Sequence, residues 1–183
     1  MGTNRGRQTR MSTFFIDESK ARGYTVVAAI VLPSEVAPLR RSVDELRMRG
    51  QRRLHFAKES DQRRRAILST LQAAQVHGIA YQAHERDDLA SRTLCLQAVV
   101  ADALRLGVTR IVLEQDDSIV SHDRQVLFTA LRRAARADIT YEHARAATES
   151  LLALPDAIAW AIARGGDWRR RVNPMIDSLQ RLP

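Results

Sequence analysis

Carboxylates that follow short apolar runs are the residues of this sequence with the clearest potential for chemistry. The stretch TFFIDESK places Asp17 and Glu18 directly after three apolar residues, and the later stretch TRIVLEQDD is built in the same way. This second run ends in Glu114, Asp116 and Asp117. Sites in open α/β sheets form just beyond the carboxyl ends of strands. If both runs are strands, the sequence predicts an acidic site at one edge of a sheet.

Asp156 is a further candidate, from a different kind of segment. It lies in the apolar stretch ESLLALPDAIAWAIAR, immediately after Pro155. Proline is best tolerated in the first turn of a helix, so Asp156 is expected at a helix N-terminus, where the backbone dipole favours an anion. Two interpretations stay open. Asp156 is either a helix-stabilising acid, worth about 0.3–1 kcal/mol, or a carboxylate of the same site as Asp17.

Three carboxylates that meet at one site raise one another's pKa values unless a cation is present. Mg²⁺ and Mn²⁺ prefer oxygen ligands, so either ion would remove the conflict. Two such ions about 3.5–4 Å apart can activate a water and stabilise the leaving oxygen of a phosphodiester. We therefore predict a Mg²⁺ or Mn²⁺ site formed by Asp17, Asp156 and at least one acid that follows the second run, with Glu114, Asp116 and Asp117 as the candidates.

Strand alternation separates these acids by face. Asp17 is expected to share a face with Phe15, whereas Glu18 points to the opposite face. Glu18 is then either a group that orients an arginine or a water at the site, or an ordinary turn acid. Glu149, seven residues before Asp156, is a candidate fourth acid.

The charge of the chain favours a polyanionic partner. It carries 29 Lys and Arg against 21 Asp and Glu, a formal net charge of +8, and only Lys20 and Lys58 are lysines. Guanidinium groups bind phosphate through two parallel hydrogen bonds, so clustered arginines suit a nucleic acid, either RNA or DNA. Solvated helix faces in an Arg-rich and Ala-rich chain are the alternative. The candidate nucleic-acid-binding residues are Lys20, Arg52, Arg53, Arg63, Arg64 and Arg65.

Length and composition limit the remaining classes of protein. The 183 residues are expected to form one main domain. No apolar run approaches the roughly 20 residues of a membrane helix, and the first residues lack the apolar segment of a signal peptide. The single cysteine, Cys95, excludes an internal disulfide and fits a reducing cytoplasm. We expect a cytoplasmic protein without a membrane partner, and whether it forms a homodimer stays open.

The order of the expected elements indicates an α/β domain. Runs rich in Val, Ile and aromatic residues predict strands at residues 12–19, 23–33, 78–85, 109–117 and 138–144. The first two runs are close enough in sequence to form an antiparallel hairpin. Helical spacing predicts helices at residues 35–48, 60–74, 87–106, 119–136 and 155–163. The expected capping residues are Ser34, Ser60, and Asp87 or Asp88 at the starts, and Gly107 at a helix end.

This pattern predicts a mixed sheet of about five strands, with an initial antiparallel hairpin and flanking helices. Residues 1–11 are polar and basic and are expected to form a flexible arm. Residues 12–166 form the expected single domain, and residues 167–183 form a basic C-terminal tail, for which a last helix stays open.

Taken together, these motifs resemble the domain of unknown function 3800 family. FFIDES, YTVVAAIVL, LHF and LLALPDAIAWAIAR follow one another in this order, and the resemblance spans roughly residues 12–164. Members of that family typically open with a strand ending in Asp-Glu-Ser. They continue with an apolar strand and a His-Phe or His-Trp segment, and carry a late Leu-x-x-Ala-Asp helix. The resemblance implies a ribonuclease H-like fold and a metal-dependent nuclease or a relative, often linked to mobile elements or phage defence.

The resemblance also implies roles for individual residues. The acidic residues of the family match Asp17 and Asp156, and Glu114 would take the place of the middle acid in such folds. His55, from LHF, would transfer a proton or touch substrate, with a structural histidine as the alternative. Two positions depart from the family pattern: Lys20 replaces a small residue, and Pro155 replaces alanine. Neither change removes a carboxylate, and a non-catalytic nucleic-acid-binding or interaction module on the same fold is the alternative function.

Overall fold

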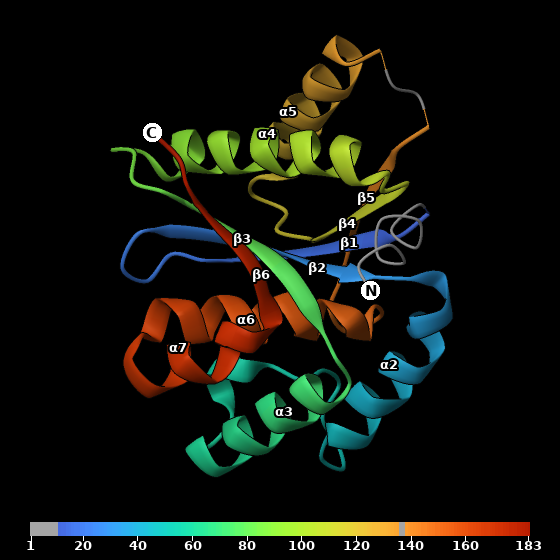
Figure 1. The fold of residues 1–183 in the computed structure, drawn as a ribbon, viewed down its shortest axis with the longest axis vertical. Helices are drawn as coiled ribbons and strands as arrows, with labels where there is room; N and C mark the ends of the chain where they lie inside the picture. Colours follow the sequence, from blue (N-terminus) through green and yellow to red (C-terminus); the bar gives the residue numbers. More distant parts are fainter. Residues whose placement is uncertain (1–10, 136–137) are drawn as a thin grey trace, which may run out of the picture.

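The computed structural model describes residues 11–135 and 138–183 and consists of one mixed sheet with helices on both faces (Figure 1). Its strands are β1 (Thr13–Ser19), β2 (Tyr24–Val31), β3 (His77–Ala83), β4 (Arg110–Glu114), β5 (Thr140–Ala144) and β6 (Ile176–Arg181). The strand order is β5-β4-β1-β2-β3-β6. The predicted α/β class is confirmed. The arm predicted at residues 1–11 lies outside the described residues, except for Met11.

β1 lies in the interior of the sheet and has a different relation to each neighbour. It pairs antiparallel with β2, with Thr13 opposite Val31, which confirms the predicted hairpin. On its other side it pairs in parallel with β4, with Ile16 opposite Leu113. Parallel neighbours run in the same direction, so the carboxyl ends of β1 and β4 lie side by side at one edge of the sheet.

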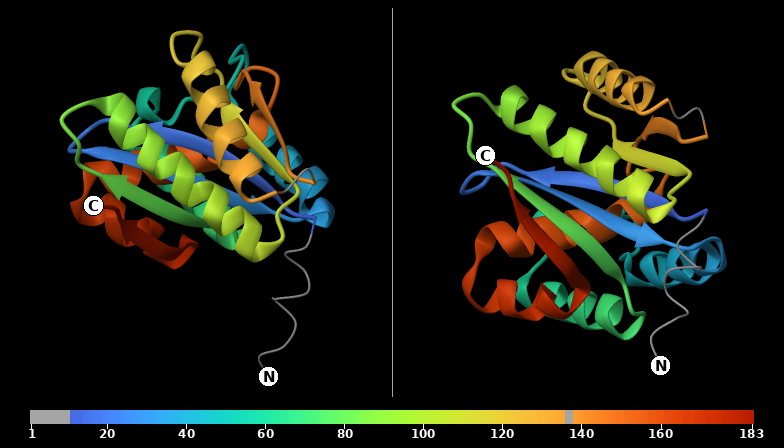
Figure 2. Two further views of the ribbon diagram at one scale, coloured as in Figure 1. Left: turned by 90° about the horizontal axis from the view of Figure 1, so that it is seen from above. Right: turned by 45° about the horizontal axis from the view of Figure 1, so that its top comes forward.

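The helices form two layers around the sheet. They are α2 (Pro33–Leu46), α3 (Asp61–Ala73), α4 (Asp88–Leu106), α5 (Val120–Arg133), α6 (Ala153–Arg164) and α7 (Gly166–Val172), with short 3-10 turns η1 (Phe56–Lys58), η2 (Ser150–Leu152) and η3 (Asn173–Met175). α4 and α5 cover one face, and α6 lies against the other with α2, α3 and α7 around it (Figures 1 and 2). None of the helices in the described ranges is long and apolar enough to span a bilayer.

Alternate side chains of β1 enter two separate cores. Phe14 and Ile16 pack in the core beneath α4 and α5, and Phe15 packs in the core shared with α6. Each of these buried side chains contributes about 1.5–3 kcal/mol. A slip of β1 by one residue would exchange the two faces, so this burial fixes the register. It therefore also fixes the face on which Asp17 emerges.

Most of the predicted helix boundaries agree with the structure. Ser60 caps α3 by accepting from a backbone N–H at 3.3 Å, Asp87 caps α4 in the same way at 3.1 Å, and Gly107 ends α4 with φ of 72°. The first helix differs from the expectation, because it begins at Pro33 rather than after a Ser34 cap. Proline has a fixed φ that suits the first helical position and lacks only an N–H that would have no helical partner there.

The C-terminal tail is part of the sheet. After α7, which agrees with the open expectation of a last helix, the chain forms β6 and pairs in parallel with β3. This sixth strand was not predicted. Its sequence, IDSLQR, is mainly polar and only partly buried, so it lacks the apolar alternation that marks interior strands.

Gly78 in β3 marks a close approach between backbones. A Cβ added at this residue would lie 2.8 Å from the carbonyl oxygen of Ala28. We expect Gly78→Ala to lower the free energy of unfolding by about 1–3 kcal/mol, the usual range for overpacking. Urea denaturation measures this change, and an unaltered midpoint would contradict the close approach of β2 and β3.

Candidate active site

Asp17 and Glu114 lie at the ends of neighbouring parallel strands. They follow directly after Ile16 and Leu113, the last residues paired between β1 and β4. Asp17 continues the face of Phe15, and Glu114 continues that of Val112, which belongs to the same core as α6. Both acids therefore emerge on the α6 side of the sheet.

Asp156 lies in the first turn of α6, on that same side. Its Oδ2 accepts a hydrogen bond of 3.0 Å from the backbone N–H of Phe56, and His55 Nδ1 lies 3.7 Å from the same oxygen. The segment between α2 and α3, which contains the LHF motif, thus fastens onto the N-terminal end of α6. This contact fixes the position of the Asp156 carboxylate and leaves its other oxygen without a described hydrogen-bond donor.

The electrostatics of Asp17 show that these acids converge. Only 8% of Asp17 is exposed. Burial raises the pKa of Asp17 well above its usual range, and repulsion from Asp156, Glu114 and Glu18 raises it further. One contact acts in the opposite direction, because the backbone N–H of Glu18 donates to Asp17 Oδ1 at 2.7 Å. Asp17 is a buried carboxylate among other carboxylates, the arrangement that a cation would relieve.

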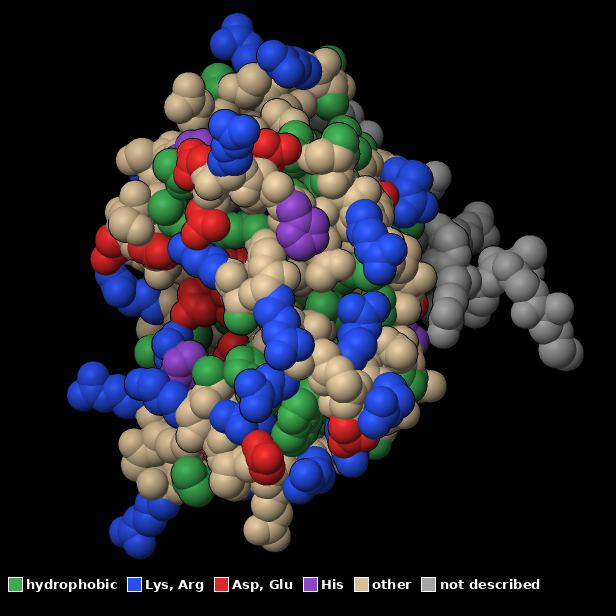
Figure 3. All heavy atoms as spheres, turned by 90° about the vertical axis from the view of Figure 1, so that its left-hand side faces the viewer, with side chains coloured by type: hydrophobic (Ala, Val, Ile, Leu, Met, Phe, Trp, Pro, Cys, Tyr) green, Lys and Arg blue, Asp and Glu red, His purple; other side chains and the backbone are tan. Residues whose placement is uncertain are grey.

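An open cavity of about 430 Å³ lies in front of these strand ends. It is lined by Asp17, Glu18, Glu114, Gln115, Asp116 and Asp117. Figure 3 views the molecule from the left of Figure 1, and on this face acidic side chains lie set back between Lys and Arg side chains. A cavity of about 460 Å³ between α4 and α5 has no carboxylate in its lining, so we place the chemistry in the acidic one.

Arg53 occupies part of the acidic site. Its Nη1 forms a short ion pair with Glu114 Oε1. Within residues 11–135 and 138–183, no group of three or more His, Cys, Asp or Glu side chains is arranged to hold a metal ion. The donor chemistry nevertheless suits a hard divalent ion, since Asp17, Asp156 and Glu114 offer only oxygens. Arg53 holds one oxygen of Glu114, so a metal ion would compete with Arg53 for that oxygen.

The two acids that competed for the middle position lie in the loop after β4. Asp116 Oδ1 accepts from both the N–H and the hydroxyl of Ser118, at 3.0 and 2.6 Å, and these bonds lower the pKa of Asp116. Asp117 is exposed, and hydrogen bonds from Gln115 and Arg145 lower its pKa. Both line the cavity with Glu114, and the charge of Glu114 raises the pKa of Asp17.

Glu18 belongs to a buried network on the opposite face of the sheet. Its carboxylate lies 2.9 Å from Nη1 of Arg92, and Arg92 also holds Asp123 with two hydrogen bonds. His143 Nε2 lies 2.9 Å from Asp123. Sequence reasoning did not find this network. The sequence feature that could have revealed this network is Arg92, because it lies at helical spacing on the apolar stripe that contains Leu96.

The expected nucleic-acid-binding residues have different environments. Arg63 donates hydrogen bonds to Glu59 and to the carbonyl of Leu46. Arg64 donates to Asp61 and to two carbonyls of the η1 segment. The Arg64 guanidinium also lies 4.4 Å from the ring centroid of Trp160. These two arginines therefore fasten the segment that holds Asp156.

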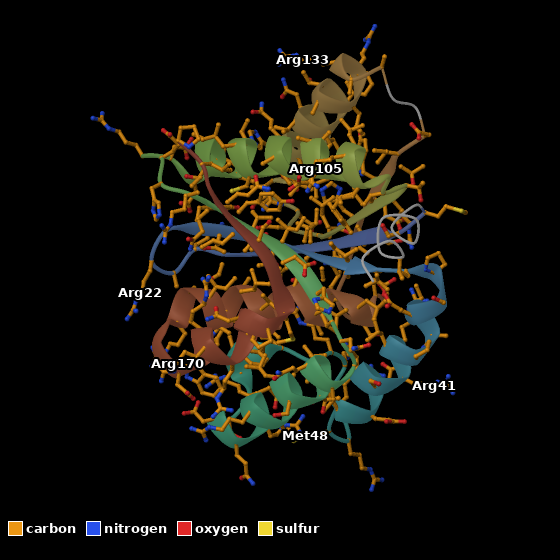
Figure 4. The ribbon with its side chains drawn as sticks, viewed as in Figure 1. Arg22, Arg41, Met48, Arg105, Arg133 and Arg170 are labelled. Atoms are coloured by element: carbon orange, nitrogen blue, oxygen red, sulfur yellow. The ribbon has the colours of Figure 1, made fainter. Side chains whose placement is uncertain are left out.

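Arg65 lies 5.5 Å from the ring centroid of Trp168 and is exposed, as are Lys20 and Arg52. Lys20 is close enough to Asp116 to lower the pKa of that acid. Other arginines lie on different sides of the molecule, and Figure 4 labels Arg22, Arg41, Arg133 and Arg170 among them. The positive charge is therefore spread over the surface rather than gathered in one stripe.

Glu149, the candidate fourth acid, makes contacts that join two parts of the fold. Its carboxylate forms a 2.6 Å ion pair with Arg40 of α2 and accepts from the backbone N–H of Leu151 at 3.2 Å. It is not among the groups that raise the pKa of Asp17. Glu149 therefore ties α2 to the turn that precedes α6.

Comparison with known proteins identifies the fold. No protein-family model matches the chain. No curated protein matches it either. Among solved structures, the chain is similar to RNase HII in the PCNA:RNase HII complex from Archaeoglobus fulgidus, with a TM-score of 0.54 and 16% identity over 84% of this chain and 73% of that one. The likeness shows that this chain has a ribonuclease H-like fold.

Proposed function

We propose that this chain is a Mg²⁺- or Mn²⁺-dependent nuclease that hydrolyses phosphodiester bonds of RNA or DNA. The observation that carries the proposal is the placement of Asp17, a buried carboxylate at the end of β1, beside Glu114 at the end of β4 and on the side of the sheet where Asp156 lies in the first turn of α6. Carboxylates do not gather in this way without cost unless a cation compensates them. The ribonuclease H-like fold and the net charge of +8 favour a nucleic acid as the substrate on which this ion would act.

In this proposal the acids hold the ion and the neighbouring groups hold the acids. Asp17 and Asp156 are the primary ligands, and Glu114 joins them after release from Arg53. Divalent ions at such a site supply Lewis acidity for attack by water on the phosphodiester. The Phe56 N–H fixes one oxygen of Asp156. His55, whose Nδ1 lies 3.7 Å from the same carboxylate, would move a proton in this proposal.

Two resemblances support the proposal. The solved structure with the same fold is named RNase HII, a ribonuclease. The sequence motifs resemble the domain of unknown function 3800 family, whose acidic positions match Asp17 and Asp156. Membership of that family, and the link to mobile elements or phage defence that it implies, are part of the proposal.

Cleavage assays test the proposal. The purified chain is incubated with end-labelled single-stranded RNA, single- and double-stranded DNA, and an RNA–DNA hybrid, each with Mg²⁺, Mn²⁺ or EDTA. We expect cleavage of at least one substrate with metal and none with EDTA. Asp156→Asn should abolish it, whereas Asp117→Asn, which changes an exposed acid at the same cavity, should not. Metal-independent cleavage, or equal activity of Asp156→Asn and wild type, would overturn the proposal.

Arg53 provides a separate prediction, because Glu114 and a substrate phosphate would compete for its guanidinium group. Arg53→Gln frees Glu114, so we expect tighter Mn²⁺ binding in the absence of nucleic acid. The same change should weaken nucleic-acid binding and reduce the slope of log K against log salt by about 1, the loss of one phosphate contact. Titration calorimetry and fluorescence anisotropy measure the two effects.

Arg52→Gln is the matched control for Arg53, since it removes an exposed guanidinium one residue away that has no acidic partner among the described residues. It should weaken nucleic-acid binding without changing Mn²⁺ affinity. Weaker Mn²⁺ binding in Arg53→Gln would show that Arg53 does not compete with the ion.

A non-catalytic nucleic-acid-binding module is the second candidate function. The Arg53–Glu114 ion pair favours it, because a chain that never binds metal would neutralise its acids with arginine in this way. The two functions predict different behaviour. A binding module shows salt-dependent affinity for nucleic acid without cleavage in any metal, and its affinity increases when Asp17 loses its negative charge.

A further inference from the structure

Arg92 is the most deeply buried cation among the described residues, and it lies directly behind the candidate active site. It comes from the second turn of α4, and only 2% of it is exposed. Nε and Nη2 bond the two oxygens of Asp123, at 2.5 and 2.8 Å, while Nη1 donates to the Tyr24 hydroxyl at 2.9 Å and pairs with Glu18 at 2.9 Å. α4, α5 and the β1–β2 hairpin therefore meet at one guanidinium.

This network reaches Asp17 through the peptide bond between Asp17 and Glu18. Arg92 holds the Glu18 side chain on the α4–α5 side of the sheet, and strand alternation directs Asp17 to the α6 side. The N–H of Glu18 donates to Asp17 Oδ1 at 2.7 Å. The residue that Arg92 holds thus carries the only hydrogen-bond donor that the described residues offer to the Asp17 carboxylate.

We propose that Arg92 is a positioning residue for the candidate active site. By holding Glu18, it fixes the N–H that orients Asp17 and leaves Oδ2 of that carboxylate available on the opposite face. The inference rests on the proposed function, because its purpose is to present Asp17 to a divalent ion. It assigns Glu18 as an anchor for the strand end rather than as a ligand.

The energetics favour a positioning role over a purely stabilising one. Moving a guanidinium and two carboxylates out of water is expensive, and apolar side chains of similar volume often give equal or greater stability. An ionic cluster does, however, fix geometry, since a guanidinium accepts partners only in the plane of its fork. Hydrogen bonds to groups that hold a metal ligand typically change metal affinity by about 10–100-fold.

The test uses the full chain, labelled with ¹⁵N, in four forms: wild type, Glu18→Gln, Arg92→Met and Arg92→Lys. Two quantities are measured for each folded form, the dissociation constant for Mn²⁺ and the hydrogen-exchange rate of the Glu18 amide. Glu18→Gln removes the charge that Arg92 holds with almost no change of shape, so it answers the question even if Arg92→Met fails to fold.

We expect Glu18→Gln and Arg92→Met to weaken Mn²⁺ binding by about 10–100-fold and to speed exchange of the Glu18 amide. Arg92→Lys, which keeps a charge without the fork, should lie between them and wild type. Tyr81→Phe is the matched control, because it removes a buried 2.9 Å hydrogen bond to Asp102 in the same core, away from Glu18. It should lower Tm and leave both measured quantities unchanged.

The outcomes separate this inference from the proposed function. If folded Glu18→Gln keeps wild-type Mn²⁺ affinity and amide exchange, Arg92 does not position Asp17 and the inference is overturned. If wild type itself does not bind Mn²⁺, the proposed function fails. In that case only the hydrogen-exchange rate of the Glu18 amide tests the inference. Faster exchange in Glu18→Gln supports the inference, and unchanged exchange overturns it.

Discussion

We expect Asp17→Asn to abolish the proposed metal-dependent cleavage and, at neutral pH, to make the folded chain more stable. The loss of activity should be at least about 10³-fold, since ion binding contributes several kcal/mol to the transition state and each 1.36 kcal/mol is tenfold. The gain in stability has a different origin. Burial and the carboxylates of Asp156, Glu114 and Glu18 disfavour the ionised form of Asp17, and asparagine removes that charge while keeping the shape.

The gain in stability depends on pH in a defined direction. The pKa of Asp17 is raised in the folded chain, whereas in the unfolded chain it is near its ordinary value of about 3.9. Below that pH, Asp17 is protonated in both states and the variant has no advantage. As pH rises through the folded pKa, wild type loses stability that the variant keeps. The advantage should therefore be absent below about pH 4 and complete above the raised pKa.

Thermal unfolding across pH, in EDTA, measures this advantage, and cleavage assays measure the loss of activity. Each kcal/mol gained should raise Tm by roughly 2–4 °C for a chain of this size. Asp117→Asn is the control, since Asp117 is exposed and bonded to Arg145. A lower Tm for Asp17→Asn at neutral pH would contradict the repulsion, and retained cleavage would contradict its assignment as a ligand.

Asp123→Ala has the largest expected effect on stability. It leaves Arg92 buried with Glu18 as its remaining carboxylate partner, and it removes the partner of His143. Removing one member of a buried ion pair costs about 3–5 kcal/mol, because the other charge stays buried without compensation. This is a large part of the roughly 5–15 kcal/mol that stabilises a folded domain. The variant should unfold at much lower urea concentration than wild type.

The pH dependence of Asp123 has the opposite sign to that of Asp17. Burial alone would raise the pKa of Asp123, but hydrogen bonds from Arg92 and His143 lower it overall. Its contribution to stability is therefore present above the unfolded pKa, about 3.9, and is lost as pH falls toward the folded value. The difference between Asp123→Ala and wild type should be complete at neutral pH and shrink below about pH 4.

Equilibrium urea unfolding at several pH values checks this prediction. Asp117→Ala is the matched control, because it removes an acid whose ion pair with Arg145 is fully accessible to solvent. That variant should keep the wild-type midpoint. If Asp123→Ala also keeps it, the buried network contributes nothing and cannot anchor β1.

The sequence predicted those parts of the fold and site that depend on local patterns. The hairpin of β1 and β2 follows from two adjacent apolar runs, and the placement of Asp17 on the same face as Phe15 follows from strand periodicity. Pro155 correctly predicted that Asp156 lies in the first turn of a helix, although α6 begins two residues earlier than expected, at Ala153. Each of these predictions depends only on residues that are close to one another in the sequence.

The parts that were not predicted depend on contacts between distant residues. Arg92 and Glu18 are 74 positions apart, and Arg53 and Glu114 are 61 positions apart, so no spacing rule connects either pair. β6 is an edge strand with a polar sequence, and only its pairing with β3 identifies it. From the sequence, Arg63 and Arg64 were candidates for nucleic-acid binding, because a sequence does not reveal the backbone carbonyls that these arginines bind in the fold.

The most direct test of the central claim is a crystal structure of the chain grown with Mn²⁺, with anomalous diffraction recorded to locate the ion. We predict an anomalous peak between the carboxylates of Asp17 and Asp156, with Glu114 released from Arg53 and turned toward the ion. Ordered Asp17 and Asp156 side chains with no peak between them, in crystals grown with Mn²⁺ in large molar excess over the protein, would contradict the account.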